Sequence, residues 1–455
     1  MFYGVILSLK IQRKASDTMS DIRADIEENI ESSQEKYEDL KPELSSKIEW
    51  FKDQKIGVIF HWGLYSEAGI VESWQLSAED NWARKKPWRN DLTTLRHDYW
   101  QLNKNFNPLQ FNPNSWAKQV KDAGFKYMLF TTKHHDGFNM YDTQLSPYKV
   151  THKDSPFANN QNADIFKAIT NAFRAEDISV GAYYSKPDWH SPYYWEPGSS
   201  PIGRYASYSP LDKPTTWQKF NNFVSGQLNE ICQNYGDIDI LWLDGGWVNS
   251  DNNEYLDMAK IVPQLRKHQP ALLVVDRTIG GEFENYVTPE RKIPEELPNK
   301  AWESNIPLAK NWGYVPNDIY KPFSEILETL IKIVSLGGNV ILGIGPKPDG
   351  TLPQEAQNIM SQLGKWLAIY GEGIYDTRPY KITTIGNWYF TKKQNYLFAY
   401  LMPHEHDITL NTLDLQSEQP VHSCENLATG TNIPLHKNTL TLPASTTVTA
   451  IKIKF

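Results

Sequence analysis

The decapeptide IDILWLDGGW, residues 238–247, decides the fold, because its apolar run stops at a carboxylate that two glycines and a tryptophan follow. The first five residues include three Ile or Leu side chains and a Trp, which is typical of a strand buried on both faces in a parallel sheet. Asp244 then stands at the carboxyl end of this strand, where parallel α/β barrels keep their functional residues. From this segment alone, a functional role for Asp244 and a structural role in capping the next turn are about equally well supported, because aspartate often precedes glycine in turns.

Other strand-like apolar segments recur along the chain, and helix-like segments separate most of them. The strand-like segments span residues 56–65, 125–132, 178–185, 271–275 and 339–345. The helix-like segments span residues 114–123, 163–174, 216–235, 253–267 and 323–336. This alternation predicts βα units and a parallel sheet. Because ionisable residues follow most of the strands, we expect an α/β fold with a (β/α)8-like barrel over residues 45–375. An open sheet would instead gather its ligand residues at one switch point.

Both ends of the chain depart from this pattern. Beyond residue 375, short alternating strands separated by turn residues predict a small C-terminal antiparallel β-sandwich domain over residues 376–455. Residues 1–44 form an N-terminal extension, charged from residue 17 onward, which we expect to be a solvated helix or tether. The opening run MFYGVILSLK has no preceding basic residue and no clear cleavage site, so it is a poor signal peptide and leaves the compartment open.

Composition argues against several classes of protein. The 455 residues carry a net charge of −8 and no run of Lys or Arg, so we expect no nucleic-acid partner. No stretch approaches the ~20 apolar residues that a membrane span needs, so we expect a soluble protein with no membrane partner. The two cysteines, Cys232 and Cys424, support neither a disulfide framework nor a cysteine-based metal site. The oligomeric state stays open.

Histidines and an arginine stand at other predicted strand ends. His61 follows the first strand, His134 and His135 follow the second, and Arg277 follows the fifth. A single histidine more often fills a core or caps a helix than binds a ligand. The carboxyl ends of parallel strands, however, meet at one edge of the sheet. We therefore expect these four side chains to lie near Asp244.

Several longer motifs, taken together, carry a family resemblance. They are FHWGLY at residues 60–65, TTKHHDGF at 131–138, LWLDGGW at 241–247 and GGNVILGIGPKPDG at 337–350. In this order they resemble the alpha-L-fucosidases of glycoside hydrolase family 29, over roughly residues 45–375. The resemblance implies a (β/α)8-like barrel followed by a β-sandwich. It also implies a retaining exo-glycosidase that removes terminal α-L-fucosyl residues from a fucosylated oligosaccharide or glycoconjugate, with neither cofactor nor metal.

The resemblance also implies roles for individual residues. Asp244 matches the family's nucleophile, and Glu290, in YVTPER, matches one version of its acid/base, with Glu303, in AWES, as the alternative. Substrate-binding positions match His61, Glu72, Trp74, His134, His135, Tyr183, Trp242 and Arg277. The segment ESW at residues 72–74 departs from the family's adjacent Glu-Trp pair, so the aromatic residue that flanks Glu72 stays open.

The chemistry of a retaining glycosidase sets conditions on these residues. It needs one carboxylate to attack the anomeric carbon and a second carboxyl, about 5 to 5.5 Å away, to donate and then remove a proton. We expect Asp244 to stay ionised and Glu290 to have a raised pKa. Neutral histidines suit sugar hydroxyls, since each imidazole offers one donor and one acceptor. Trp242 or Phe138 is a candidate to cover the apolar C6 methyl group of fucose.

Two other readings compete with hydrolysis by paired carboxyls. In the first, His61, His134, His135 and Asp136 ligate a metal, which makes the protein a metal-dependent hydrolase. In the second, the barrel binds sugar without hydrolysing it, which predicts that one of the two carboxyls is missing from the site. The sequence does not specify the linkage that is cleaved, nor does it exclude the related sugar α-L-galactose, which differs from fucose only at C6.

Overall fold

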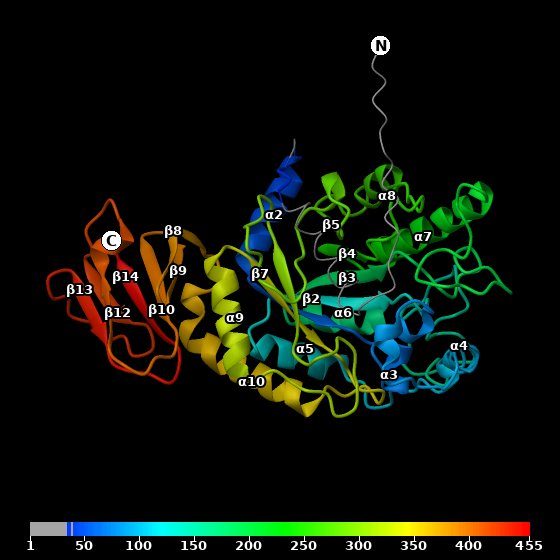
Figure 1. Ribbon diagram of the computed structural model, residues 1–455, viewed down its shortest axis with the longest axis horizontal. Coiled ribbons are helices and arrows are strands. Elements are labelled where there is room, and N and C mark those ends of the chain that lie inside the picture. Colours follow the sequence, from blue (N-terminus) through cyan, green and yellow to red (C-terminus); the bar gives the residue numbers. More distant parts are fainter. Residues whose placement is uncertain (1–33, 38–39) are drawn as a thin grey trace, which may run out of the picture.

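The computed structural model describes residues 34–37 and 40–455. Most of the expected extension over residues 1–44 lies outside the described residues. A large part built from helices and a parallel sheet is followed by a smaller part built from antiparallel strands (Figure 1). The α/β class and the change to antiparallel strands near the C-terminus are therefore confirmed.

The parallel sheet has seven strands in the order β5-β4-β3-β2-β1-β7-β6. Their bounds are β1 (Ile56–Phe60), β2 (Tyr127–Lys133), β3 (Ser179–Ser185), β4 (Ile240–Asp244), β5 (Leu273–Asp276), β6 (Glu303–Pro307) and β7 (Asn339–Ile344). Every pairing within it is parallel. All seven strands therefore present their carboxyl ends at the same edge, as the strand-end pattern of the sequence required.

Helices precede and separate the strands and cover the outer face of the sheet (Figure 1). Their bounds are α2 (Pro42–Gln54), α3 (Leu64–Ala68), α4 (Leu92–Tyr99), α5 (Pro113–Asp122), α6 (Ile165–Ala175), α7 (Pro214–Asn234), α8 (Met258–Leu265), α9 (Phe323–Ser335) and α10 (Gln354–Tyr370). Helix α6 shows why such a segment forms a helix that packs on the sheet. It buries Ile165, Ile169 and Phe173, which share a face at a spacing of four residues. The Asp164 side chain caps its first turn by accepting a hydrogen bond from the Lys167 amide.

Alternation along each strand separates two cores. Val58 and Phe60 of β1 join the large cluster between sheet and helices, whereas Ile59 joins a second cluster on the inner face. This inner cluster includes Ile59, Leu129, Tyr183, Ile240, Trp242, Val275 and Ile341. Helix α2 adds Phe51, whose ring stacks on Tyr286 at a centroid distance of 4.1 Å. Helix α2 therefore covers one end of the inner core.

Strand β6 lies within residues 278–320, where the sequence showed no strand-like or helix-like segment. Its sequence ESNIP contains a single aliphatic residue, Ile306, yet all five residues are buried. Burial follows from the neighbours, since β7 pairs with β6 along its whole length. The sequence pattern missed this strand because a strand held by its partners needs no β-branched or alternating pattern of its own.

A segment at residues 284–291 lies between the two edge strands of the sheet. On one side, the Asn285 amide donates a hydrogen bond to the carbonyl of Val274, in β5, at 2.8 Å. On the other, Val287 donates to Ala301 at 2.9 Å, and the Asn305 amide of β6 donates to the Pro289 carbonyl at 3.1 Å. This segment therefore links β5 to β6 through its backbone, and it carries Glu290.

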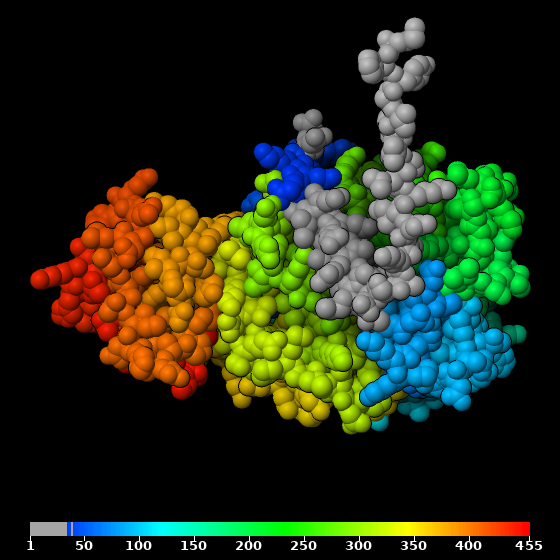
Figure 2. Space-filling model, in the orientation of Figure 1, coloured from blue at the N-terminus to red at the C-terminus, as the bar shows by residue number. Residues whose placement is uncertain are grey.

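The C-terminal part contains two antiparallel sheets. The larger has the order β12-β14-β10-β9-β8 and the smaller pairs β11 with β13. Bounds are β8 (Arg378–Ile385), β9 (Trp388–Lys393), β10 (Tyr396–Leu401), β11 (Ile408–Asn411), β12 (Ser423–Asn426), β13 (Thr439–Leu442) and β14 (Thr449–Lys454). A common apolar cluster, with Leu401, Ile451 and Leu440, joins the two sheets. Figure 2 shows residues beyond 376, orange to red, at one end of an elongated molecule.

Two features of the described residues bear on the expectations from composition. Among them, no helix is both long enough and apolar enough to cross a membrane. Cys232 and Cys424 are both buried and both free, in agreement with the expectation of no disulfide framework.

Truncating Phe51 to alanine should destabilise the folded protein by about 3–5 kcal/mol, because it opens a cavity under Tyr286 and Tyr127. Denaturant unfolding of Phe51→Ala followed by tryptophan fluorescence measures this loss. Ser46→Ala, at an exposed position of the same helix, serves as the control. A loss below 1 kcal/mol in Phe51→Ala would mean that α2 does not stabilise the inner core.

Candidate active site

Five predicted side chains meet at the carboxyl edge of the sheet. We call them the strand-end cluster: His61, His134, His135, Asp244 and Arg277. The rings of His134 and His135 lie 4.1 Å apart between centroids, and those of His61 and His134 lie 6.2 Å apart. Each follows or ends a different strand of one parallel sheet, except for the two adjacent histidines after β2. The sequence-based expectation that these residues lie together is therefore met.

Asp244 is held by two donors. The Tyr183 hydroxyl donates to Oδ2 at 2.6 Å, and Arg277 Nη1 donates to Oδ1 at 3.1 Å. Burial by itself would raise the pKa of Asp244, but the Arg277 charge and the Tyr183 hydrogen bond outweigh it and lower that pKa below its ordinary value. The side chain keeps 18% of its surface exposed. Asp244 is thus an ionised, reachable carboxylate, not one turned into the interior.

Arg277 bridges Asp244 to the predicted acid/base. Its Nη2 donates to Glu290 Oε2 at 2.6 Å, while its Nη1 holds Asp244, so both carboxylates share one guanidinium. The guanidinium carbon lies 4.8 Å from the centre of the Trp242 ring. Trp242 itself is only 4% exposed and stacks on Tyr183 at 5.4 Å. It therefore supports Arg277 and Tyr183 from the inner core.

Glu290 departs from the expectation of a raised pKa. Burial raises its pKa, but the guanidinium groups of Arg277 and Arg291 reverse that shift and lower the pKa below its ordinary value. The expectation considered desolvation by aromatic neighbours and did not foresee two arginines. A tryptophan is indeed present: Trp312 Nε1 donates to Glu290 Oε1 at 3.1 Å.

The three histidines are neutral. Burial lowers the pKa of His61 to about 4 and lowers those of His134 and His135 well below their ordinary value. Two hydroxyls orient the rings: Ser73 Oγ lies 2.6 Å from His134 Nδ1, and Ser185 Oγ lies 2.7 Å from His135 Nδ1. The Nε2 atom of His135 has no hydrogen-bond partner in the described chain. Neutral, oriented imidazoles of this kind suit the hydroxyl groups of a sugar.

Comparison with known proteins decides the family. The family model described as Alpha-L-fucosidase matches residues 25–372. This chain belongs to the alpha-L-fucosidase family. It is therefore a glycoside hydrolase.

Relatives and solved structures agree with this assignment. Tissue alpha-L-fucosidase of Homo sapiens is 30% identical over 365 residues, which are 75% of this chain and 73% of the relative. The structure of alpha-L-fucosidase isoenzyme 1 from Paenibacillus thiaminolyticus matches with a TM-score of 0.75 at 27% identity, over 90% of this chain and 99% of that one. A glycoside hydrolase family 29 alpha-L-fucosidase from Bacteroides thetaiotaomicron, trapped as a covalent intermediate, matches in fold with a TM-score of 0.74 at 22% identity, over 92% of this chain and 97% of that one.

Trp74 lies beside the strand-end cluster. Its ring meets the His135 ring edge-on at 4.8 Å and packs near Trp247 at 5.7 Å. The guanidinium of Arg204 lies 4.8 Å from the Trp74 ring centre. Trp74 is part-exposed, so it forms an aromatic wall beside the strand-end cluster.

Glu72 and Phe138 are both buried, and they have different surroundings. Glu72 is 3% exposed, and its Oε1 accepts a hydrogen bond from the Gly313 amide at 2.6 Å. Phe138 is 1% exposed and packs against Phe106 and Tyr148 in the outer core. The expectation that Phe138 covers a sugar was wrong, because the side chain after HHDG turns back under the helices.

Glu303, the alternative acid/base, lies at the opposite end of the sheet. It is the first residue of β6, paired with the first residue of β7, and it is completely buried. The Tyr127 hydroxyl donates to its Oε2 at 2.5 Å. Burial raises the pKa of Glu303 to about 8, despite the hydrogen bond from Tyr127 that lowers it. Glu303 belongs to the floor of the inner core, whereas Glu290 shares Arg277 with Asp244.

Several other strand-end carboxylates hold loops together. Asp136 accepts a hydrogen bond from the Tyr99 hydroxyl at 2.6 Å, and Asp188 accepts from the Ser191 amide at 2.8 Å. Asp276 pairs with the buried Lys186 at 2.6 Å. Asp136 was a proposed metal ligand in the metal-dependent reading, and its hydrogen bond to Tyr99 gives it a structural task instead.

Sequence reasoning missed Trp312, Ser73 and Ser185. Ser73 and Ser185 orient the two histidines, and Trp312 binds Glu290. The motif NWGY contains Trp312, but it follows β6, a strand that the sequence did not reveal. A tryptophan before glycine just after a recognised strand would have been the usable signal.

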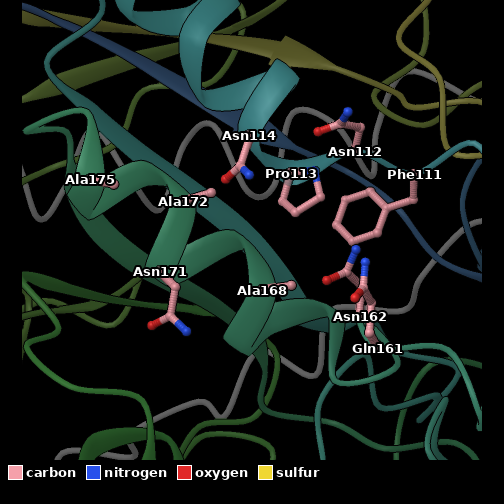
Figure 3. Close-up of a pocket in the computed structure, with 10 residues that line it drawn as sticks. All are labelled: Phe111, Asn112, Pro113, Asn114, Gln161, Asn162, Ala168, Asn171, Ala172 and Ala175. Atoms are coloured by element: carbon pink, nitrogen blue, oxygen red, sulfur yellow. The ribbon is translucent and has the colours of Figure 1, made fainter.

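The outer face of the α/β part carries a separate groove. A cavity of about 490 Å³ lies between α5 and α6, and Figure 3 shows the ring of Phe111 beside it. Carboxamide side chains line much of it, namely Asn112, Asn114, Gln161, Asn162 and Asn171. Within the described chain, this lining includes no member of the strand-end cluster, so the groove is not the candidate active site.

The strand-end cluster also has the residue types of a metal site. Ligand atoms of His134, His135 and Asp244 all lie within 4.8 Å of one another. Arg277, however, already places a cation 3.1 Å from Asp244 Oδ1. A second cation on the same carboxylate would meet this charge at short range.

We therefore expect the purified protein to retain well below one equivalent of zinc after incubation with zinc and dialysis. Elemental analysis of the protein measures the bound metal. Activity on an aryl α-L-fucoside before and after treatment with a chelator completes the test. Stoichiometric zinc together with chelator-sensitive activity would establish the metal-dependent reading.

Proposed function

We propose that this chain is a retaining exo-glycosidase that removes terminal α-L-fucosyl residues from fucosylated oligosaccharides or glycoconjugates. The observation that carries the proposal is the shared guanidinium: Arg277 binds Asp244 at 3.1 Å and Glu290 at 2.6 Å. Two carboxylates within the span of one guanidinium suit the short separation, about 5 to 5.5 Å, that retaining glycosidases need. In this proposal Asp244 is the nucleophile and Glu290 is the acid/base.

The reaction takes two steps. In the first, an Asp244 oxygen attacks the anomeric carbon, the bond to the leaving oxygen breaks, and Glu290 gives that oxygen its proton. In the second, Glu290 takes a proton from water, the water oxygen attacks the anomeric carbon, and the bond to Asp244 breaks. Two inversions retain the configuration. A covalent intermediate of this kind was trapped in the Bacteroides thetaiotaomicron enzyme, which supports the proposal by analogy.

Protonation of Glu290 must accompany substrate binding. The guanidinium groups of Arg277 and Arg291 lower its pKa while it is ion-paired, at 2.6 Å from Arg277. A general acid has to carry a proton at the operating pH. We infer that a bound glycoside weakens the ion pair between Glu290 and Arg277 and leaves the guanidinium to Asp244.

The surrounding residues supply recognition of the sugar. We propose that His61, His134 and His135 bind hydroxyl groups through neutral imidazoles, and that Trp74 offers an apolar wall. Tyr183, Trp242 and Arg277 complete the pocket by orienting Asp244. Inhibitor complexes of a bacterial fucosidase with the same fold support a site of this kind.

The finer architecture also belongs to this proposal. We propose that the segment at residues 284–291 completes a (β/α)8-like barrel by linking β5 to β6. The barrel then spans residues 45–375. Residues 376–455 form a β-sandwich domain whose two sheets pack through one apolar cluster.

A sugar-binding barrel without hydrolysis is the weaker alternative. That reading predicted a missing carboxyl, and both Asp244 and Glu290 stand at the same edge with part of their side chains exposed, 18% and 24%. The metal-dependent reading is weaker because of the Arg277 charge beside Asp244.

Replacing Asp244 with alanine should lower turnover of an aryl α-L-fucoside by roughly 10⁴-fold or more, because the attacking oxygen is lost. Steady-state kinetics and circular dichroism measure activity and folding. Asp239→Ala is the matched control, since Asp239 begins the same strand segment at the opposite end and pairs with Lys47. Undiminished turnover in Asp244→Ala would remove Asp244 from the mechanism.

Replacing Glu290 with alanine should slow fucosides with poor leaving groups by about 10²- to 10⁴-fold and activated ones far less, because only poor leaving groups need the proton. External azide should partly restore turnover of activated substrates. Glu303→Ala serves as the comparison, and we expect it to affect stability but not the dependence on the leaving group. The reverse result would assign the acid/base role to Glu303.

A further inference from the structure

We propose that Arg204 is a positioning residue that holds Trp74 against His135 by packing on both the Trp74 and the Trp247 rings. This inference rests on the proposed function, in which Trp74 is an apolar wall of the sugar site. Arg204 lies in the connection between β3 and α7, whereas Trp74 lies between α3 and α4. The proposal therefore gives the loop after β3 a task in recognition of the sugar.

The first step is the aromatic surroundings of His135. Its ring lies 4.8 Å from the Trp74 ring and 5.0 Å from the Trp247 ring, centroid to centroid. A third indole, that of Trp189, lies 5.2 Å away. In the proposed function the His135 imidazole binds a sugar hydroxyl. The position of the Trp74 ring therefore shapes the space beside that imidazole.

The second step is the weak local support of Trp74. Trp74 begins η1 (Trp74–Leu76), a 3-10 helix of three residues whose start no side chain caps. So short a helix has few backbone hydrogen bonds of its own, and their geometry is poorer than in an α-helix. Trp74 is also partly exposed, so the core does not enclose it. Contacts from other loops therefore have to fix the direction of this ring.

The third step is the contact that Arg204 supplies. Its guanidinium carbon lies 4.8 Å from the Trp74 ring centre and 5.0 Å from the Trp247 ring centre. An aromatic ring attracts a cation at this distance, and a flat guanidinium packs well on such rings. Arg204 Nη2 also donates to Asp80 Oδ1 at 2.5 Å, and that oxygen accepts from Trp82 Nε1 at 3.1 Å. The buried Asp80 carboxylate thus fixes the guanidinium beside both rings.

The fourth step is the fixed backbone of Arg204. Its carbonyl accepts hydrogen bonds from Trp189 Nε1 at 3.0 Å and from Trp247 Nε1 at 3.1 Å. Trp247 belongs to the motif LWLDGGW, so this link leads back to the strand that ends at Asp244. The backbone of Arg204 is therefore held beside the nucleophile, and its side chain reaches from there to Trp74.

A second arginine joins the same two loops. Arg96 Nε donates to the Leu76 carbonyl, in η1, and Arg96 Nη2 donates to the Pro201 carbonyl, both at 2.9 Å. Arg96 thus contacts the backbone of both loops, whereas Arg204 contacts the rings. Because Arg96 keeps the loops joined, replacement of Arg204 should disturb the Trp74 ring more than the path of the chain.

The test measures binding of L-fucose by isothermal titration calorimetry. Arg204→Ala should weaken this binding by about 5- to 20-fold, because Trp74 loses the contact that fixes its ring. Arg89→Ala is the matched control, since Arg89 lies 3.7 Å from the Trp88 ring centre and pairs with Asp98 at 2.6 Å, outside the strand-end cluster. We expect the control to bind L-fucose within about twofold of wild type.

Kinetics on two fucosides, one with a good and one with a poor aryl leaving group, separate this role from an effect on the acid/base. Arg204→Ala should raise KM by a similar factor on both and change kcat by about threefold or less, because recognition of the fucosyl group is disturbed and proton transfer is not. A much larger loss on the poor leaving group would place the effect at Glu290 and overturn the proposal.

A double-mutant comparison identifies the route. On a Trp74→Ala background, Arg204→Ala should weaken L-fucose binding by a further twofold or less, about the scatter of such cycles. Full additivity would overturn the proposal, because Arg204 would then act independently of Trp74.

Arg204→Lys covers the case in which Arg204→Ala fails to fold by circular dichroism. Lysine keeps a positive charge beside the buried Asp80 but lacks the flat guanidinium, so L-fucose binding should weaken by about threefold or more. If only this variant folds, it decides, and binding as tight as that of wild type would contradict the role of Arg204.

The outcome is separate from that of the proposed function. A wild-type protein that cleaves neither fucoside would refute the proposed function itself. A wild-type protein that cleaves both, with L-fucose binding no weaker in Arg204→Ala than in Arg89→Ala, would refute only the role of Arg204.

Discussion

The site depends on one arginine between two partly buried carboxylates. Two like charges at short range in a poorly solvated place oppose each other, and one of them would ordinarily take up a proton. Arg277 binds both and holds the pKa of each below its ordinary value. Three neighbouring backbone pieces bring this about: β4 ends at Asp244, Arg277 directly follows β5, and the segment at residues 284–291 carries Glu290. Side-by-side order in the sheet is therefore the condition for the chemistry.

Polar residues at the strand ends divide into two groups with different tasks. Those of the strand-end cluster meet at the carboxyl edge of the sheet, and the hydroxyls of Ser73 and Ser185 orient the rings of two of its histidines. Asp136, Asp188 and Asp276 instead bind hydroxyl, amide or ammonium groups of the protein and hold the connecting loops. A strand-end position is thus not enough to mark a residue as functional. Among the carboxylates, exposure separates the groups, since Asp244 keeps 18% of its side chain exposed whereas Asp136, Asp188 and Asp276 are buried.

Sequence was sufficient where local pattern decides the outcome. Apolar runs of β1 and β4 predicted strands, and their shared direction predicted that His61 and Asp244 meet. The sequence was insufficient where residues distant in the chain decide the local structure. Strand β6 has one aliphatic residue and is held by β7, so neither it nor Trp312 behind it was foreseen. The pKa of Glu290 depends on Arg277 and Arg291, which the fold brings to it. The direction of Phe138 is likewise decided by distant residues, because its ring packs in the outer core.

The backbone of residues 284–291 forms hydrogen bonds to both edge strands of the sheet, β5 and β6, and the same segment carries the Glu290 carboxyl group of the site. The same segment thus serves both the stability of the sheet and the chemistry of the site. An insertion or deletion inside this segment would shift Glu290 and also break its backbone hydrogen bonds to β5 and β6. A change of length in a loop outside this segment, for instance around Trp74, would leave the link between the two edge strands in place.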